Sequence, residues 1–380
     1  MRTRLLTSGM VFAVGVAGFC IWSSAPLAGQ SAQGPQGQSS ARRPAASSRA
    51  ALPRTADGHP DLQGVYDVAT LTQLERPEAF GTSLSMPDTQ AAKLEQAVAA
   101  RKDRLAQPSD GNRAAPPIGG DGSVGAAGNV GGYNNFWIDN GEKYVEIDGQ
   151  KRTSVIVEPT NGRVPALLPA AQKRNAARLV QTTSDEQEGN DPGLERAPGA
   201  YDDPERRPLG ERCLMGFGST SGPPSLPVLY NNLHQIVQTK DHVMILNEMV
   251  HDVRVIRMND THLPPTVRKW MGDSIGRWEG DTLVVDTTNF TDKTRFRGSS
   301  ENLHVVERFS RLDERTLLYR FTVEDPTTWA TSWTGEYTWP LTDERLYEYA
   351  CHEANYALGN ILRGARQRDR EAAAKRSANR

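Results

Sequence analysis

The chain has 380 residues, with 44 Lys and Arg against 46 Asp and Glu and a formal net charge of −2 at pH 7. The charge falls to −4 if Arg2 and Arg4 are removed with a signal segment, so no global field attracts nucleic acid or anionic lipid, and we expect neither as a partner. The roughly 310 residues left after a leader and a linker suffice for one large β domain, or for a domain with an elaborated N-terminal half.

Residues 1–28 have the pattern of a secretory signal peptide. Arg2 and Arg4 form a basic start, an apolar segment runs over residues 5–22, and small residues follow it. An uncleaved membrane anchor is the alternative, because such a segment could just span a bilayer. Its glycines keep it only moderately hydrophobic, however. We therefore expect cleavage and a periplasmic or secreted protein that has no membrane attachment afterwards.

Residues 29–51 are rich in Gln, Ser, Ala and Gly, and predict a flexible linker because they bring too little apolar surface to offset the entropy of ordering. Residues 52–212 predict strands, one or two helices and long loops that belong to the same domain as residues 213–362. The expected elements are a short strand through Val65 and Val68, a helix over 87–106, a surface loop over 113–132, two or three strands within 135–159, a helix over 170–180 and an exposed excursion over 182–207.

Residues 213–362 change to an antiparallel β meander, in which short apolar runs alternate with tight turns such as Glu279-Gly280-Asp281. Strands are expected over 234–239, 243–250, 253–258, 277–278, 282–288, 303–312, 316–324, 333–339 and 346–351. This spacing predicts a mainly β fold, an antiparallel up-and-down (lipocalin-like) barrel or a sandwich, with a partly helical and irregular N-terminal half. Residues 363–380 predict a basic C-terminal tail, either a solvated helix or a frayed end.

Two cysteines remain once Cys20 leaves with the signal segment. In an oxidising compartment, Cys213 and Cys351 predict one disulfide bond. A bridge that closes so long a loop is worth about 4–5 kcal/mol in the chain-entropy model, and often less in practice. The alternative is a pair of unpaired, buried thiols.

Several strings along the chain are familiar, among them ILNEMVHDVRVI, GDSIGRWEGDTLVVDTTNFT and YEYACHEANYALGNILRGAR. They resemble a large family of exported bacterial proteins of unknown function, and the resemblance covers roughly residues 52–366. Tyr66 and Ala354 stand where that family's pattern has Trp and Gly. The resemblance implies export but no activity. The aromatic and hairpin pattern is also weakly similar to lipocalin-like barrels, an analogy of fold alone.

Polar residues interrupt the apolar alternation near residue 247 and cluster again after Cys351. A histidine switches its charge near neutral pH, and a carboxylate within reach would fix its tautomer. Neighbours on a strand point to opposite faces, so Asp252 can orient His251 only across a bulge. The alternative is a polar strand end that is merely hydrogen-bonded. The predicted catalytic residues are Glu248, His251, Asp252, His304, His352 and Glu353.

These residues are expected to form the rim of the main cavity, with tryptophans as its aromatic walls. The predicted ligand-binding residues are Arg254, Trp278, Trp333, Asn355 and Tyr356. Tryptophans of β proteins more often pack the core, which is the alternative. The histidines show no HxH or HExxH spacing and the cysteines no paired CxxC arrangement, so we predict no metal and no cofactor.

Two functions from different classes are consistent with these residues. One is an enzyme of the lyase, isomerase or hydrolase kind that uses histidine and carboxylates on a small carbohydrate or secondary metabolite. The other is a non-catalytic binding protein for a small apolar or sugar-like ligand. Convergence of the histidines with carboxylates at one mouth would favour catalysis, because convergent titratable groups in a pocket mark functional sites. A purely structural exported domain is the third possibility.

Overall fold

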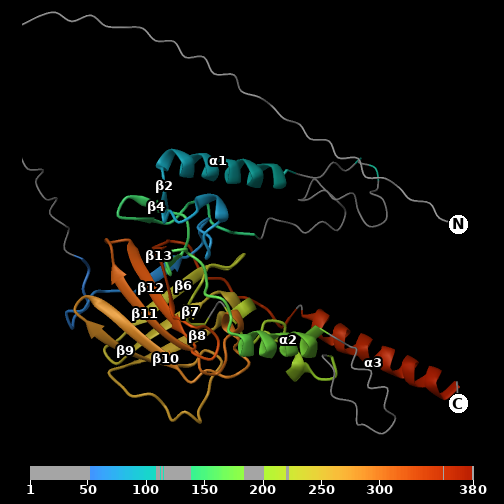
Figure 1. The fold of residues 1–380 in the computed structure, drawn as a ribbon. Helices are drawn as coiled ribbons and strands as arrows, with labels where there is room; N and C mark the ends of the chain where they lie inside the picture. Colours follow the sequence, from blue (N-terminus) through green and yellow to red (C-terminus); the bar gives the residue numbers. More distant parts are fainter. Residues whose placement is uncertain are drawn as a thin grey trace, which may run out of the picture. The chain divides into compact units, whose positions relative to one another are not determined.

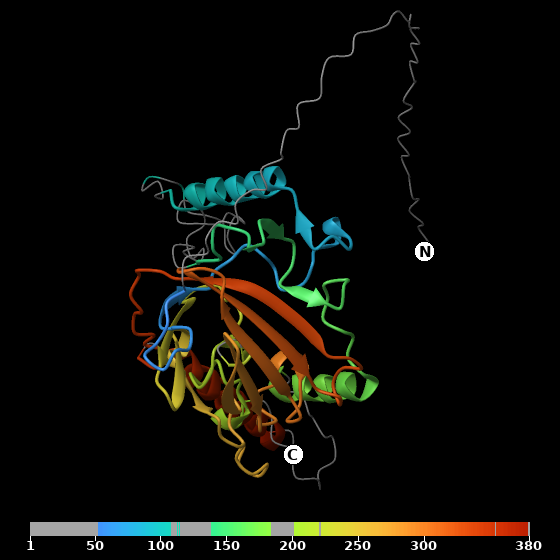
Figure 2. The same ribbon diagram turned by 90° about the vertical axis from the view of Figure 1, so that its left-hand side faces the viewer.

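A curled ten-stranded sheet forms most of the fold (Figures 1 and 2). The computed structural model describes residues 52–107, 112, 114, 138–183, 201–219, 222–353 and 355–378, without the side chains of 179–183. The strands, in their order across the sheet, are β1 (Gly64–Asp67), β6 (Leu233–Gln238), β7 (His242–Asn247), β8 (Val253–Met258), β9 (Asp273–Glu279), β10 (Thr282–Thr288), β11 (His304–Arg311), β12 (Thr316–Glu324), β13 (Trp333–Pro340) and β5 (Ile156–Glu158). The mainly β fold is confirmed.

The core lies on one face of this sheet, and the alternation between buried and partly exposed residues along β12 shows which face it is. On β12 the inward side chains are Leu317, Tyr319, Phe321 and Val323, all without exposed surface, while Leu318, Arg320 and Thr322 between them are partly exposed. On β13 Trp333, Tyr337 and Trp339 add large rings to the same face. Burial of a large aromatic side chain stabilises the fold by about 1.5–3 kcal/mol, so this wall is the main apolar contribution.

One strand pair departs from the predicted up-and-down order. β8 and β9 pair in parallel, whereas the other neighbouring pairs of the sheet are antiparallel. Parallel neighbours need a connection that travels back along the sheet, so residues 259–272 form a crossover loop instead of a hairpin. The loop is fastened to β10 and the residues after it, where the Asn289 side chain donates to the Leu263 carbonyl at 2.8 Å and the Arg268 side chain to the Phe290 carbonyl at 2.9 Å.

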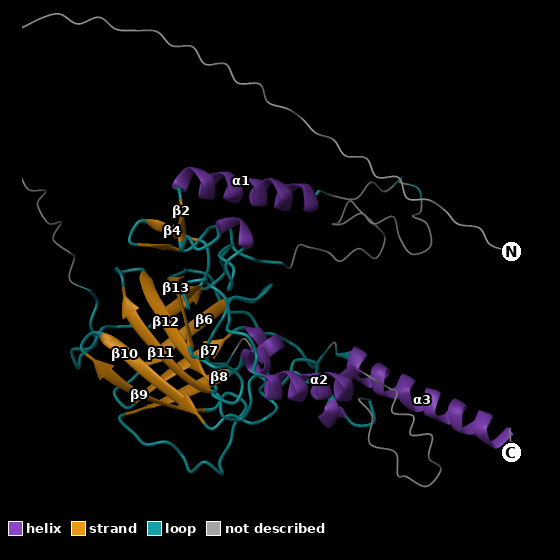
Figure 3. Cartoon of the chain, viewed as in Figure 1, coloured by secondary structure: helices purple, strands orange, loops and turns teal. Residues whose placement is uncertain are grey.

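The N-terminal half adds a second, small sheet and two helices, as Figure 3 shows. The small sheet has the order β2 (Ser85–Met86), β4 (Gln150–Arg152) and β3 (Glu146–Ile147). The predicted helices are confirmed as α1 (Asp88–Leu105) and α2 (Pro169–Thr183), and the tail forms α3 (Tyr356–Ala378). Short 3-10 turns are η1 (Glu78–Phe80), η3 (Pro204–Arg206), η4 (Phe217–Ser219), η5 (Met249–His251) and η6 (Phe296–Gly298).

The strand predicted over 346–351 is wrong: residues 342–350 carry no strand pairing. The position beside β13 is taken by β5, whose Ile156 pairs with Gly335, so the expected final hairpin has no edge to join. At the other end of the sheet, one isolated bridge joins Tyr66 of β1 to Leu341, and the Thr342 amide donates to the Val65 carbonyl. Closure around a whole lipocalin-like barrel stays a prediction.

The predicted signal peptide, the whole linker at 29–51 and all of the loop at 113–132 except Ala114 lie outside the described residues. Residues Arg49–Arg380 cluster as one compact unit. Within the described part of the chain, no helix has the length and apolar character that crossing a bilayer requires.

Candidate functional site

The corner between β7 and β8 holds three of the predicted catalytic residues. β7 ends at Asn247, whose amide donates to the Asp252 carbonyl at 2.8 Å and so closes a tight corner over residues 248–252. Val250 and His251 both have left-handed backbones, with φ of 62° and 48°. Left-handed conformations are costly for residues with a Cβ, above all for a β-branched one, at about 1–3 kcal/mol each. The corner therefore holds strained residues in place.

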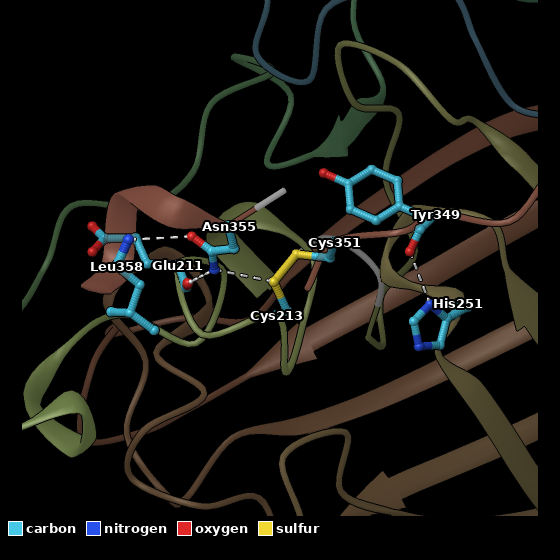
Figure 4. The surroundings of a disulfide bond; sticks show 7 residues. All are labelled: Glu211, Cys213, His251, Tyr349, Cys351, Asn355 and Leu358. Carbon is cyan, nitrogen blue, oxygen red and sulfur yellow. Dashed lines mark hydrogen bonds between the residues drawn. A yellow bond between two sulfur atoms is a disulfide. The ribbon is translucent and has the colours of Figure 1, made fainter. Parts of the chain in front are cut away.

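Because the corner breaks the strand, alternation does not decide where His251 points. Figure 4 shows its ring turned to the segment that precedes Cys351, where Nδ1 lies 3.2 Å from the Tyr349 carbonyl. A carbonyl oxygen only accepts, so Nδ1 carries the proton and Nε2 is the nitrogen that can accept one. A 3-10 turn between two strands, rather than a bulge within one strand, sets the direction of the His251 ring, and the group placed against Nδ1 is the Tyr349 carbonyl. Asp252 contributes its backbone carbonyl to the corner.

The predicted disulfide bond fixes that opposing segment. Cys213 and Cys351 are bonded, with their Cα atoms 5.8 Å apart (Figure 4). The Asn355 side chain donates to the Glu211 carbonyl at 2.8 Å and approaches Cys213 Sγ at 3.4 Å. Its Oδ1 accepts from the Leu358 amide, a hydrogen bond typical of a helix N-terminus. Asn355 therefore fastens the start of α3 to the bridge.

A buried carboxylate joins the corner to the same segment. The Glu248 side chain is 5 % exposed, and its Oε1 accepts from the Tyr347 amide at 3.0 Å. The Glu248 amide itself donates to the Leu233 carbonyl at the start of β6. Two hydrogen bonds, one accepted by the Glu248 carboxylate and one made by His251 Nδ1, therefore hold the corner against residues 347–349.

Asp67, at the end of β1, is a second carboxyl group in this region that the sequence reasoning missed. It pairs in register with Leu233, the residue whose carbonyl receives the Glu248 amide. Burial raises the pKa of the Asp67 carboxyl, the hydrogen bond from the Ala69 amide lowers it, and the negative charges of Asp139, Glu344 and Glu248 raise it again, to about 6 in all.

We call Asp67, Glu248 and His251 the seam cluster, because they lie where β1, β6, β7 and residues 347–349 meet. A carboxyl with a pKa near 6 can both give and take a proton near neutral pH, and a neutral imidazole can accept one. Titratable groups with shifted pKa values gather at functional sites. The stacked rings of Tyr230 and Tyr349, with centroids 6.5 Å apart, add partly exposed aromatic surface beside the cluster.

The remaining predicted residues lie elsewhere or on the surface. His352 and Glu353 are exposed beside the disulfide bond, and Tyr356 is 75 % exposed at the start of α3. Trp278 stacks on His59, with ring centroids 4.6 Å apart and planes within 5°.

Trp333 is fully buried against Phe296, Phe321 and Trp329. The structure thus makes it core, because the inward face of β13 is packed with rings. Arg254 is also inside, where its guanidinium pairs with Glu307 at 2.5 and 3.1 Å and Tyr319 donates to the same carboxylate at 2.7 Å.

His304 is not brought together with His251. Its Nε2 lies 3.1 Å from Asp286 and its Nδ1 lies 3.3 Å from Glu324, on the outward face of the sheet. These two carboxylates raise the pKa of His304, the bond to Asp286 most of all. The three strand spacings from β8 to β11 put about 14 Å of sheet between the corner and this histidine.

His262 extends the outward array and also went unnoticed in the sequence. Its Nε2 lies 3.0 Å from the other Asp286 oxygen, and its Nδ1 lies 3.2 Å from Asp273. Asp273 is fully buried, and Arg257 and Lys269 hold its pKa well below its usual range in spite of that burial. The crossover loop carries His262 to this position, so only the parallel pairing could have revealed it.

Among the residues that the structure describes, no group of three or more His, Cys, Asp or Glu side chains could hold a metal ion. The chain matches no protein-family model, and comparisons with curated proteins and with solved structures found no significant match. The resemblance to exported bacterial proteins therefore stays a prediction.

Proposed function

We propose that the seam cluster carries out acid–base chemistry on a small hydroxylated molecule, such as a carbohydrate or a secondary metabolite, in the manner of a lyase, isomerase or hydrolase. The observation that carries this proposal is the Asp67 carboxyl, whose pKa of about 6 comes from burial beside Glu248. A partly buried carboxyl with a raised pKa is found mainly where its proton is used, because ionising it near neutral pH weakens the fold.

The roles follow from the protonation states. Near pH 6 Asp67 is partly protonated and can act as the general acid, giving its proton to an oxygen that develops negative charge. His251 has Nε2 available to take a proton from the substrate, since Nδ1 is bonded to the Tyr349 carbonyl. One proton leaves the substrate at one position and another returns at the second, which is the balance of an isomerisation or an elimination. Glu248 is the positioning residue that holds residues 347–349.

We also infer that the chain is exported and that its curled sheet closes in a lipocalin-like manner. The disulfide bond supports export, because such bonds persist in oxidising compartments. The bridge between Tyr66 and Leu341 supports closure, because it joins β1 to the residue that follows β13. A closed sheet would leave the seam cluster at one of its ends, where a rigid barrel displays functional residues.

Binding without catalysis is a second candidate, and a separate observation favours it. The indole N–H groups of Trp329 and Trp333 are buried and have no hydrogen-bond partner among the described residues. An unmade hydrogen bond of a buried donor costs about 1–3 kcal/mol. A small polar or sugar-like ligand that displaced part of the ring packing around these tryptophans would satisfy the donors, and it would quench their fluorescence.

The experiment that separates the two functions uses the mature protein with a panel of p-nitrophenyl glycosides and free sugars. The acid–base proposal expects turnover with a pH limb near 6 in the wild-type protein, and turnover that collapses both in Asp67→Asn and in His251→Ala. His242→Ala is the matched control, because that histidine is exposed on the same strand pair. Saturable tryptophan quenching without turnover would support binding instead. Turnover that survives in both seam variants would refute the acid–base proposal.

A further inference from the structure

A cavity of about 340 Å³ opens between the segment before β6 and the loop that follows β10. It shares no residue with the seam cluster. Its lining combines charged side chains with three glycines, which bring backbone close to the space. The lining residues are Glu205–Gly210, Gly216, Gly218 and Lys293–Arg295.

The charge of this lining is strongly unbalanced. Four cationic side chains, Arg206, Arg207, Lys293 and Arg295, face one carboxylate, Glu205. Glu205 is shared, since Lys293 Nζ lies 3.4 Å from one of its oxygens and Arg212 lies 3.2 Å from the other. Glu205 therefore meets Lys293, and Glu211 outside the lining meets Arg207, so the lining cation without a carboxylate at ion-pair distance among the described residues is Arg295.

Arg207 shows that the wall is held rigidly. Its guanidinium makes two hydrogen bonds to Glu211, at 2.8 and 2.9 Å, and lies 4.5 Å above the centre of the Tyr201 ring. A fork-shaped pair with a stacked ring leaves the guanidinium little freedom. An arriving group would meet a rigid wall on this side, with the Arg207 charge already paired to Glu211.

Arg295 is the cation that the protein itself does not balance. Its backbone is left-handed, with φ of 52°, and its Nε donates to the Asp292 carbonyl at 3.3 Å. Within the described ranges no carboxylate lies at ion-pair distance from it. Burial lowers its pKa, and the negative charge of Asp292 offsets part of that effect. Burial lowers the pKa of Arg178 on α2, and the charges of Arg295 and Arg174 lower it further, against the negative charges of Asp292 and Asp325. A partly buried cation among other cations is costly unless an anion joins it.

We propose that this cavity binds a small molecule through an anionic group, a phosphate, a sulfate or a carboxylate. The planar guanidinium of Arg295 matches the oxygens of such a group in a two-pronged hydrogen bond, and Lys293 adds a point charge beside it. A volume of about 340 Å³ lies at the small end of ligand sites, enough for the anionic group and a compact body.

The test titrates the mature protein with inorganic phosphate, with sulfate and with citrate by calorimetry, at constant ionic strength. We expect saturable binding of at least one of these anions. Arg295→Gln and Lys293→Gln should each weaken it about tenfold, the loss typical of one charged hydrogen-bonding partner. Glu205→Gln should tighten it about threefold, because a competing negative charge is removed from the lining.

Arg308→Gln is the matched control, since Arg308 is a partly exposed arginine that pairs with Glu279 on the outward face of the sheet, away from the lining. Preference for phosphate and sulfate over citrate would assign a phosphorylated or sulfated ligand, and the reverse order a carboxylate. The proposal is overturned by absence of saturable binding of all three anions, by unchanged affinity in Arg295→Gln and Lys293→Gln, or by an equal loss in Arg308→Gln.

Discussion

Replacing Asp67 by Asn should stabilise the protein while removing its function. The native carboxyl has a pKa of about 6, against 3.8 for an ordinary Asp. Between these two values the folded chain keeps a proton that the unfolded chain loses. The contribution of Asp67 to the free energy of unfolding is therefore greatest below pH 4, and it falls as the pH rises through about 6. At about 1.4 kcal/mol per pKa unit, the full loss at pH 7 would be about 3 kcal/mol.

Solvent reduces that figure, because the Asp67 side chain is partly exposed, and we expect about 1–2 kcal/mol. An Asn at this position carries no charge, and its Oδ1 can still accept from the Ala69 amide. The assay is denaturant unfolding of both proteins at steps from pH 3.5 to 8, with the disulfide bond intact. Taking the difference between the two proteins cancels the other titrating groups.

The difference should be close to zero below pH 4 and should grow to its full value by pH 7, with the variant the more stable. Asp61→Asn is the matched control, because Asp61 makes the same hydrogen bond to the amide two residues on, in this case that of Gln63. A variant that is less stable at pH 7, or a difference that does not change with pH, would refute the assignment of Asp67 as a buried, protonated carboxyl.

Three further predictions concern the rest of the fold. His304→Gln should destabilise the protein below about pH 6.5, because only the protonated imidazolium gains from Asp286. The difference in stability between the two proteins should vanish as the pH rises through the raised pKa of His304. Unfolding of both proteins in parallel across pH 5–9 measures this. The double substitution Cys213→Ser and Cys351→Ser should lower the free energy of unfolding by about 2–4 kcal/mol, and it should also weaken ligand binding at the seam cluster. A double variant with unchanged stability would contradict this prediction. Arg254→Met should cost about 3–5 kcal/mol, because it leaves the buried Glu307 charge unpaired, and adding Glu307→Gln should recover part of the loss in the same unfolding assay.

Local patterns in the sequence were enough for most of the strands. Alternation over residues 316–324 reproduces β12, and Gly280, with a left-handed φ of 60°, closes the β9–β10 hairpin that the Glu279-Gly280-Asp281 turn predicts. These elements depend on neighbours in the sequence, so a short window contains the information. The disulfide bond followed from counting cysteines.

Pairing over long distances could not be read in this way. The parallel contact of β8 with β9 and the docking of β5 beside β13 depend on edges that only the assembled sheet offers. For this reason the strand expected over 346–351 is absent, and the approach of His262 to Asp286 went unpredicted.

Only part of the candidate site could be predicted from the sequence. Glu248 and His251 stood out because polar residues interrupt the alternation there, and the structure explains the interruption by a strained corner. Asp67 gave no such signal. It lies in a short strand far from the corner in sequence, and burial and the neighbouring charges that raise its pKa exist only in the folded chain.

A carbon-detected NMR titration of the Asp67 side-chain carboxyl tests most directly whether the seam cluster moves protons. The titration is run on the mature, disulfide-bonded protein from pH 3 to 8, with Asp67→Asn to assign the signal. We predict a midpoint of about 6 in the wild-type protein, and a lower midpoint in Glu248→Gln, which removes one of the neighbouring negative charges. A midpoint near 4 that Glu248→Gln leaves unchanged would contradict the proposal that the seam cluster moves protons.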